Sequence, residues 1–282
     1  LGFSGATTAG NLSVTTNNNS VTQSSNLVVA GTSNFNVGTG ADVTLGNASN
    51  NFGTVVLTSA RNATLVDTNA IALGASSVGG NLSVTTNNGA VTQTGPLNVS
   101  AGTATFNTGT AAITLANASN DFGTVSIVTT ATANLADANA IGFASVSAGN
   151  LVVTTANGAV TQTGSMNVSA GTATFNVGTA AVTLSNAANN FGTVAITAAG
   201  NATLVDVNAM NVGASTVSGN LTVTANGAVG FSGALSAGNL AVTTTNGAVT
   251  QSAALAVSGT ANFQAGTGNV TLATGTNNFN VV

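Results

Sequence analysis

Apolar and polar residues alternate along short segments of this chain. The alternation is clear in 81–85, 111–115 and 193–197, and a period of two is that of a β-strand whose side chains point to opposite faces. Phrases rich in Gly and Asn, such as Asn88-Gly89 and Gly38-Thr39-Gly40, bound these segments. Both residue types tolerate the backbone conformations of sharp turns. The pattern predicts short strands joined by tight bends, and no helical stripe or capping box predicts a helix.

The same phrases return in a fixed order about every 70 residues, which is the mark of a repeat architecture. Val-Thr-Gln begins at Val21, Val91, Val160 and Val249, and Gly-Asn-Leu-x-Val begins at Gly10, Gly80, Gly149, Gly219 and Gly238. The interval between the last two Gly-Asn-Leu phrases is far shorter than the others, and 229–251 closely matches 1–23. One unit of about 19 residues has therefore been added without disturbing the phrases after it, as expected for one turn of a solenoid. Each long repeat should then hold about three turns.

These features predict an all-β fold: a single-stranded parallel β-helix, or β-solenoid, with about 12–14 turns of roughly 19–23 residues. We assign 1–282 to a single β-solenoid with internal repeats 10–79, 80–148, 149–218 and 219–282, the last of which carries the added turn. A membrane barrel needs strands of about 9–11 residues and aromatic girdles, whereas this chain has no Trp or Tyr. A β-sandwich closes on itself and does not accept an extra turn.

The eleven Phe residues fall into three repeat-equivalent sets, and we expect them to fill the interior. The sets are Phe3, Phe143 and Phe231; Phe35, Phe106, Phe175 and Phe263; and Phe52, Phe122, Phe191 and Phe279. Outward positions are mainly Thr, Ser and Asn. We expect stacked Asn amides to hydrogen-bond to one another along the axis, as in cross-β ladders.

Composition excludes most catalytic mechanisms. Only 2% of residues are charged, and the chain has one Arg and five Asp but no Lys, Glu, His, Cys, Trp or Tyr. Ser–His–Asp and Cys–His sites and Cys/His zinc sites are therefore impossible. We predict no enzyme and no catalytic, cofactor-binding or metal-ligating residues. A net charge of −4 with a single cation predicts no binding to nucleic acid or to anionic membranes.

An apolar content of 43% and a mean hydropathy of +0.42 indicate a chain that can bury a large core. No apolar run of about 18 residues is present, so we expect no membrane insertion of this segment. No signal peptide precedes Leu1, and we expect a processed chain or a fragment.

Three of the aspartates share one repeat position: Asp67, Asp137 and Asp206. They should lie about three turns apart, which favours an Asx-turn role over a calcium site, because calcium needs several converging oxygen ligands. The remaining charges of interest are Asp42, Asp121 and Arg61, which have no charged counterparts in the other repeats. We expect these three to be solvated. Asp121 and Asp137 could approach one another, but nothing indicates the general acid that glycosidase chemistry requires.

Two stretches, Gly80–Gly95 (GNLSVTTNNGAVTQTG) and Thr183–Val194 (TLSNAANNFGTV), resemble the shaft repeats of filamentous-haemagglutinin-like bacterial exoproteins. The resemblance extends over essentially the whole chain. It implies a right-handed parallel β-helix that is exported by two-partner secretion or as an autotransporter passenger and that serves adhesion, aggregation or biofilm formation. The chain differs from that family in having no Arg-Gly-Asp tripeptide.

The leading hypothesis is a non-enzymatic structural protein, extracellular or on the bacterial cell surface: the rod of a surface adhesin or the subunit of a filament. The expected partners are other copies of the chain, stacked end to end or laterally, and a host or neighbouring-cell surface. An alternative is an ice- or crystal-surface-binding solenoid, suggested by Thr103-Ala104-Thr105 and Thr172-Ala173-Thr174. A carbohydrate-binding module is less favoured because no Trp or Tyr can stack on a sugar ring.

Overall fold

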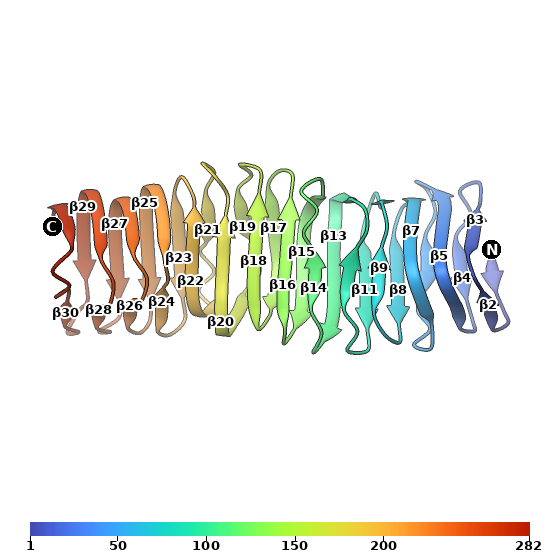
Figure 1. The fold of residues 1–282 in the computed structure, drawn as a ribbon, viewed down its shortest axis with the longest axis horizontal. Helices are drawn as coiled ribbons and strands as arrows, with labels where there is room; N and C mark the ends of the chain where they lie inside the picture. Colours follow the sequence, from blue (N-terminus) through green and yellow to red (C-terminus); the bar gives the residue numbers. More distant parts are fainter. The chain divides into compact units, whose positions relative to one another are not determined.

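A computed structural model describes residues 1–282, which form two compact units, Leu1–Ala138 and Asn139–Val282. Within each unit the strands pair in parallel with strands of the preceding and following turns, and consecutive turns lie side by side in chain order (Figure 1). The predicted all-β solenoid is confirmed, and the two units together hold about 14 turns. The chain contains no helix, and so none that could cross a membrane.

The strands of the first unit are β1 (Gly2–Phe3), β2 (Thr7–Ala9), β3 (Leu12–Thr15), β4 (Val21–Gln23), β5 (Leu27–Gly38), β6 (Val43–Leu45), β7 (Asn51–Ala60), β8 (Ala63–Asp67), β9 (Ile71–Leu73), β10 (Ser76–Ser77), β11 (Leu82–Thr86), β12 (Val91–Gln93), β13 (Leu97–Gly109), β14 (Ile113–Leu115), β15 (Asp121–Thr129) and β16 (Thr132–Asp137). Those of the second unit are β17 (Ile141–Ser147), β18 (Asn150–Thr155), β19 (Val160–Gln162), β20 (Met166–Asn176), β21 (Val182–Leu184), β22 (Asn190–Ala198), β23 (Ala202–Asp206), β24 (Met210–Val212), β25 (Ser215–Ala225), β26 (Val229–Phe231), β27 (Leu235–Thr244), β28 (Val249–Gln251), β29 (Leu255–Gln264), β30 (Val270–Thr271) and β31 (Asn278–Val281).

The register of the first unit confirms the predicted size of a turn. One inward column, whose members pair in parallel with the next, runs through Val21, Val43, Ala63, Leu82, Ala104 and Val125. The step from each member to the next agrees with a turn of roughly 19–23 residues. The adjacent outward column consists of hydroxyl residues: Thr22, Thr44, Thr64, Ser83, Thr105 and Ser126. Period-two alternation therefore places apolar side chains inside and hydroxyls outside on the same strands.

The added turn occupies one complete layer of the second unit. Leu221 of β25 pairs with Leu240 of β27, and Ala225 pairs with Thr244. Asn220 and Asn239, the asparagines of the two Gly-Asn-Leu phrases, are 19 residues apart and pair directly with one another. This confirms the prediction that the added unit makes one turn.

Phenylalanine fills the interior of most turns. Eight of the eleven Phe side chains are almost completely buried, and each contributes about 1.5–3 kcal/mol through burial. Phe106 and Phe122 from neighbouring turns pack edge to face, with ring centroids 6.3 Å apart. Phe3, Phe263 and Phe279 are only half-buried. They lie near the two ends of the given sequence, in β1, β29 and β31, and the expected interior position is confirmed for the other eight.

Candidate functional site: polar clusters at the bends

The side chain of Asn50 in the first unit is completely buried and makes five hydrogen bonds. Its Oδ1 accepts hydrogen bonds from Gln23 Nε2 at 2.7 Å and from the Leu27 amide at 2.9 Å. Its Nδ2 donates to Gln23 Oε1 at 2.8 Å and to the carbonyls of Leu45 and Val66 at 3.2 and 3.1 Å. These partners belong to three successive turns, so one carboxamide ties three layers together.

The same pairing recurs at every repeat: Gln93 with Asn120, Gln162 with Asn189, and Gln251 with Asn277. We call the four pairs, including Gln23 with Asn50, the Gln–Asn braces. They were not predicted from the sequence. The sequence does contain a signal for them. In the four repeats, the Gln of Val-Thr-Gln and the Asn that precedes an Asn-Phe or Asp-Phe pair are separated by 27, 27, 27 and 26 residues.

A buried aspartate lies beside each of the first three braces. Asp67 Oδ2 accepts a hydrogen bond from the Phe52 amide at 2.7 Å, and its Oδ1 accepts one from the Asn69 amide at 2.8 Å. Asp206 does the same with the amides of Phe191 and Asn208, at 2.6 and 2.8 Å. The bond to the amide two residues ahead confirms the predicted Asx-turn at both positions.

The third repeat-equivalent carboxylate, Asp137, accepts a hydrogen bond from the Phe122 amide at 2.7 Å. Burial raises the pKa of Asp67 and of Asp206 above the usual value, and the two backbone hydrogen bonds of each carboxylate oppose that shift. Each of the three carboxylates thus accepts a hydrogen bond from the backbone amide of a Phe 15 residues earlier in the chain.

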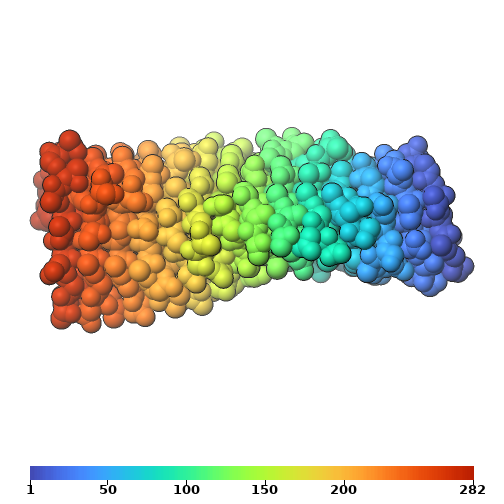
Figure 2. Space-filling model, turned by 60° about the horizontal axis from the view of Figure 1, so that its bottom comes forward, coloured from blue at the N-terminus to red at the C-terminus, as the bar shows by residue number.

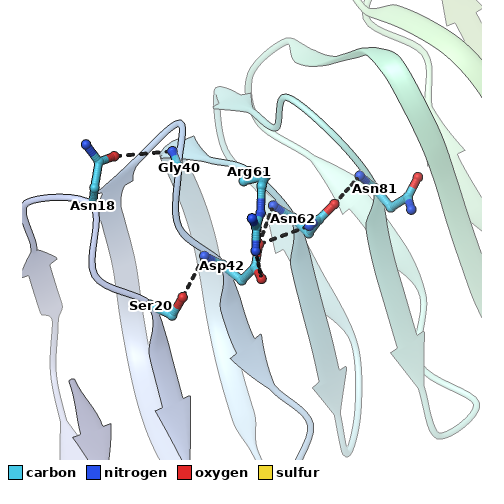
Figure 3. A network of polar contacts seen from close by, with 7 residues as sticks. All are labelled: Asn18, Ser20, Gly40, Asp42, Arg61, Asn62 and Asn81. Atoms are coloured by element: carbon cyan, nitrogen blue, oxygen red, sulfur yellow. Dashed lines mark hydrogen bonds and ion pairs between the residues drawn. The ribbon is translucent and has the colours of Figure 1, made fainter.

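A second polar cluster lies at the surface of the first unit (Figure 3). Arg61 Nε donates to Asp42 Oδ1 at 2.9 Å, and Arg61 Nη2 donates to Asp42 Oδ2 at 2.7 Å. Asn62 adds its backbone amide and its Nδ2 to the same Oδ1. The hydrogen bonds from Arg61, followed by those from Asn62, lower the pKa of Asp42 to about 2 despite partial burial, and Asp42 raises the pKa of Arg61.

The Arg61 and Asp42 side chains keep 55% and 29% of their surface exposed, so solvation describes them only in part. Each also has the other as an ion-pair partner, which the sequence did not predict. They lie 19 residues apart, which is one turn, so the coil brings them together. Asp121, the third charge without counterparts, begins β15, where it pairs in register with Asn98 of β13 and is half-buried. No group of three potential metal-ligating residues occurs in the structure.

Asparagines at the bends connect turns mainly through backbone amides, not through the amide-to-amide stacks expected from the sequence. Figure 3 shows Asn18 Oδ1 accepting from the Gly40 amide at 3.2 Å and Asn62 Oδ1 accepting from the Asn81 amide at 2.9 Å. Outside the Gln–Asn braces, direct amide-to-amide bonds between turns join, for example, Asn190 with Asn208 and Asn220 with Asn239. The reason is geometric: a bend leaves backbone N–H groups without strand partners, and a short Asn side chain reaches them.

The Thr pairs of the crystal-surface hypothesis do not continue along the units. Thr103 pairs with Thr124 in the next turn, but Thr105 lies between Ser83 and Ser126. In the second unit, Thr174 lies between Val152 and Ala195. The register therefore ends each two-column Thr array at the next turn.

Comparison with protein families finds one match. Segments 1–59, 60–129, 130–198, 199–238 and 232–282 are each similar to a family described as repeats of unknown function (DUF5649), and together they span the whole chain. Comparisons with curated proteins and with solved structures found no match. The overlap of the last two segments at 232–238 falls at the end of the added turn.

Proposed function

We propose that this chain, which belongs to the family of repeats of unknown function (DUF5649), is a non-enzymatic structural protein, a section of a β-solenoid shaft. The Gln–Asn braces carry this proposal. They recur at equivalent bends in all four repeats, and each ties a turn to its neighbours. A chain whose polar groups are used to fix turn upon turn is suited to extending a regular scaffold.

Physical chemistry explains why the braces would make such a scaffold resistant to unwinding. Separating two turns at a brace breaks the hydrogen bonds of several buried donors and acceptors at once. Each buried group left without a partner costs about 1–3 kcal/mol of stability. The apolar columns add to this cost, since every turn covers the next. Resistance is thus distributed over all turns and does not depend on one site.

We further propose that the shaft is extracellular, as the rod of a bacterial surface adhesin or as the subunit of a filament. Its support is the resemblance of the repeats to filamentous-haemagglutinin-like shafts and the nearly uncharged outer surface. Each turn contributes a strip of outward side chains to the face shown in Figure 2. The outward side chains of the first unit include the hydroxyl column from Thr22 to Ser126. Other copies of the chain and a neighbouring or host cell surface are the proposed partners.

Immunogold electron microscopy on intact cells of the producing organism tests the location. Antibodies raised against the purified chain should label the cell surface or fibres attached to it, and antibody pre-adsorbed with purified protein should not. Labelling that appears only after the cells are permeabilised would overturn the extracellular proposal. The architectural proposal is tested separately by electron diffraction of the labelled material, which should give a spacing near about 4.8 Å along the fibre or rod axis.

The crystal-surface alternative gains no support from the register, because neither unit presents a continuous pair of Thr columns. An ice-recrystallisation assay with the full chain distinguishes the two functions. A structural shaft should leave crystal growth unchanged, whereas inhibition at micromolar protein would favour the alternative.

A further inference from the structure

Four Asn-Gly dipeptides occur in the chain, and all four lie at the bend that follows a Thr-rich strand: Asn88-Gly89, Asn157-Gly158, Asn226-Gly227 and Asn246-Gly247. Asn-Gly is the dipeptide most prone to spontaneous deamidation, because glycine lacks a side chain that would shield its amide nitrogen or restrict its backbone. Asparagine is accordingly counted among the thermolabile residues. The tertiary structure treats the four dipeptides differently.

The side chains of three of the four asparagines accept hydrogen bonds from the next turn, and we call each of these contacts a clamp. Asn88 Oδ1 accepts from the amide and the hydroxyl of Thr110, both at 3.0 Å. Asn157 Oδ1 accepts from the same two groups of Thr179, at 3.1 and 3.3 Å. Asn246 Oδ1 accepts from the Thr267 amide at 2.9 Å. Each of these hydrogen bonds ties the carboxamide to the following turn and so restricts its rotation toward the amide nitrogen of its own glycine.

Backbone conformation separates the same three from the fourth. Asn88, Asn157 and Asn246 have φ of 57°, 60° and 56°, the left-handed region, whereas Asn226 is not among the residues with positive φ. A glycine of the next turn lies against the Oδ1 of each of these asparagines and also has positive φ: Gly109, Gly178 and Gly266. A Cβ on any of the three would lie within 2.4 Å of the clamped Oδ1.

Asn226 has no clamp because of the added turn. The turns that follow the other three asparagines bring a Gly-Thr phrase to the bend, 21 to 22 residues further on. The turn that follows Asn226 is the added, shorter one, which places Thr245 there, and the Thr245 amide donates to the Ala225 carbonyl at 3.1 Å. The Asn226 side chain is exposed and makes no hydrogen bond.

We propose that Asn226 is the deamidation site of the folded chain. The Gly227 amide nitrogen attacks Asn226 Cγ, the Cγ–Nδ2 bond breaks, and ammonia leaves with the proton of that amide. Water then opens the resulting five-membered succinimide to aspartate or isoaspartate. The product adds one negative charge to an outer bend of a nearly uncharged molecule, and isoaspartate also lengthens the backbone there. The modified surface is one that a partner or a repair enzyme can distinguish from the fresh protein.

The chain supplies a matched internal control. Asn157 and Asn226 occur in the same local sequence, Thr-Ala-Asn-Gly-Ala-Val, at 155–160 and 224–229. Any difference in rate between them must therefore come from the fold. Gly158 is buried and Gly227 is half-buried, which again favours access of water and base to the Gly227 amide.

The experiment is incubation of the purified full chain in warm, mildly alkaline buffer made with ¹⁸O-labelled water, followed by peptide mapping by mass spectrometry. In the folded chain, Asn226 should convert about tenfold faster than Asn157, because a reacting Asn157 must first give up one or two hydrogen bonds. In concentrated urea the two rates should become equal. Equal rates in the folded chain, or faster conversion of Asn157, would overturn the proposal.

A variant distinguishes fast deamidation at Asn226 from slow deamidation at other residues of the chain. Asn226→Gln should fold normally, since the side chain is exposed and unbonded, and it should lose the fast release of ammonia while the slow phase persists. Retention of the fast phase in this variant would show that another residue carries it and would also overturn the proposal. The outcome is independent of whether the chain is an extracellular shaft.

Discussion

The side chains of Gln23 and Asn50 hold each other through two hydrogen bonds: Gln23 Nε2 donates to Asn50 Oδ1 at 2.7 Å, and Asn50 Nδ2 donates to Gln23 Oε1 at 2.8 Å. The residues are 27 positions apart, which is more than one turn, so the pair exists only because the chain coils. Asn50 also caps carbonyls of two further turns. This relationship recurs in every repeat and is the most regular polar feature of the molecule.

Loss of one brace should therefore be costly. Asn189→Ala removes the partner of Gln162 and the hydrogen bonds that Asn189 makes with the Met166 amide and with the Leu184 and Val205 carbonyls in a buried bend. We expect the free energy of unfolding to fall by about 3–5 kcal/mol, measured by denaturant titration. The matched control is Asn262→Ala, an exposed Asn of β29 that makes no side-chain hydrogen bond, which should change stability by less than about 0.5 kcal/mol. Similar losses in both variants would contradict a bracing role.

One inward position of the first unit is not optimal. Ser33 is completely buried between Leu12 and Val55, and its Oγ has no hydrogen-bond partner. Ser33→Ala should stabilise the protein by about 1 kcal/mol, because an unpaired buried hydroxyl is removed and the other repeats already carry Ala at the equivalent positions. Thermal or denaturant unfolding measures the gain. Ser13→Ala, at an exposed outward position of β3, is the control and should be neutral. A destabilised Ser33→Ala protein would show that the hydroxyl has a partner.

The single ion pair makes a pH prediction. Arg61 chiefly lowers the pKa of Asp42, to about 2 from the usual 3.8, so Arg61→Gln should return the pKa of Asp42 toward its usual value. Because the folded-state pKa is the lower one, the stabilisation from Asp42 is fully present above the unfolded value and is lost as pH falls through the folded value. Carboxyl ¹³C NMR titration of the two proteins measures the shift. The Asp67 carboxyl, held by backbone amides, serves as the internal control. An unchanged Asp42 titration in the variant would mean that Asn62, not Arg61, sets its pKa.

The added turn of the second unit should be removable by deletion without loss of the fold. Deleting 219–237 takes out one complete layer and lets Ala202–Asp206 pair with Leu240–Thr244 in place of Leu221–Ala225, with apolar side chains still facing inward. We expect the shortened chain to keep its far-ultraviolet circular dichroism per residue and a cooperative melt. Deleting 219–228 removes about half a turn, so the later strands no longer meet their partners, and this chain should lose cooperative unfolding. Equal tolerance of both deletions would contradict the layer assignment.

The sequence by itself determined the kind of fold. Period-two alternation in short segments, Gly and Asn at the bends, and phrases that recur in a fixed order specify a coil with turns of nearly constant length, because each layer buries its apolar side only against a similar layer. The Asx-turn of Asp67 was also predictable, since the interaction is local and reaches only to Asn69.

Only the tertiary structure decided which polar groups meet. Asp42 with Arg61, Gln23 with Asn50, and the clamps on the Asn-Gly bends all join residues 19 to 27 positions apart. Whether two such residues meet depends on the length of the intervening turn, and a three-residue difference separates the clamped Asn157 from the free Asn226 within an identical local sequence. Hydrogen bonds act over about 3 Å. A pattern of residue types therefore defines the layers, but only the stacked coil sets the distances between their side chains.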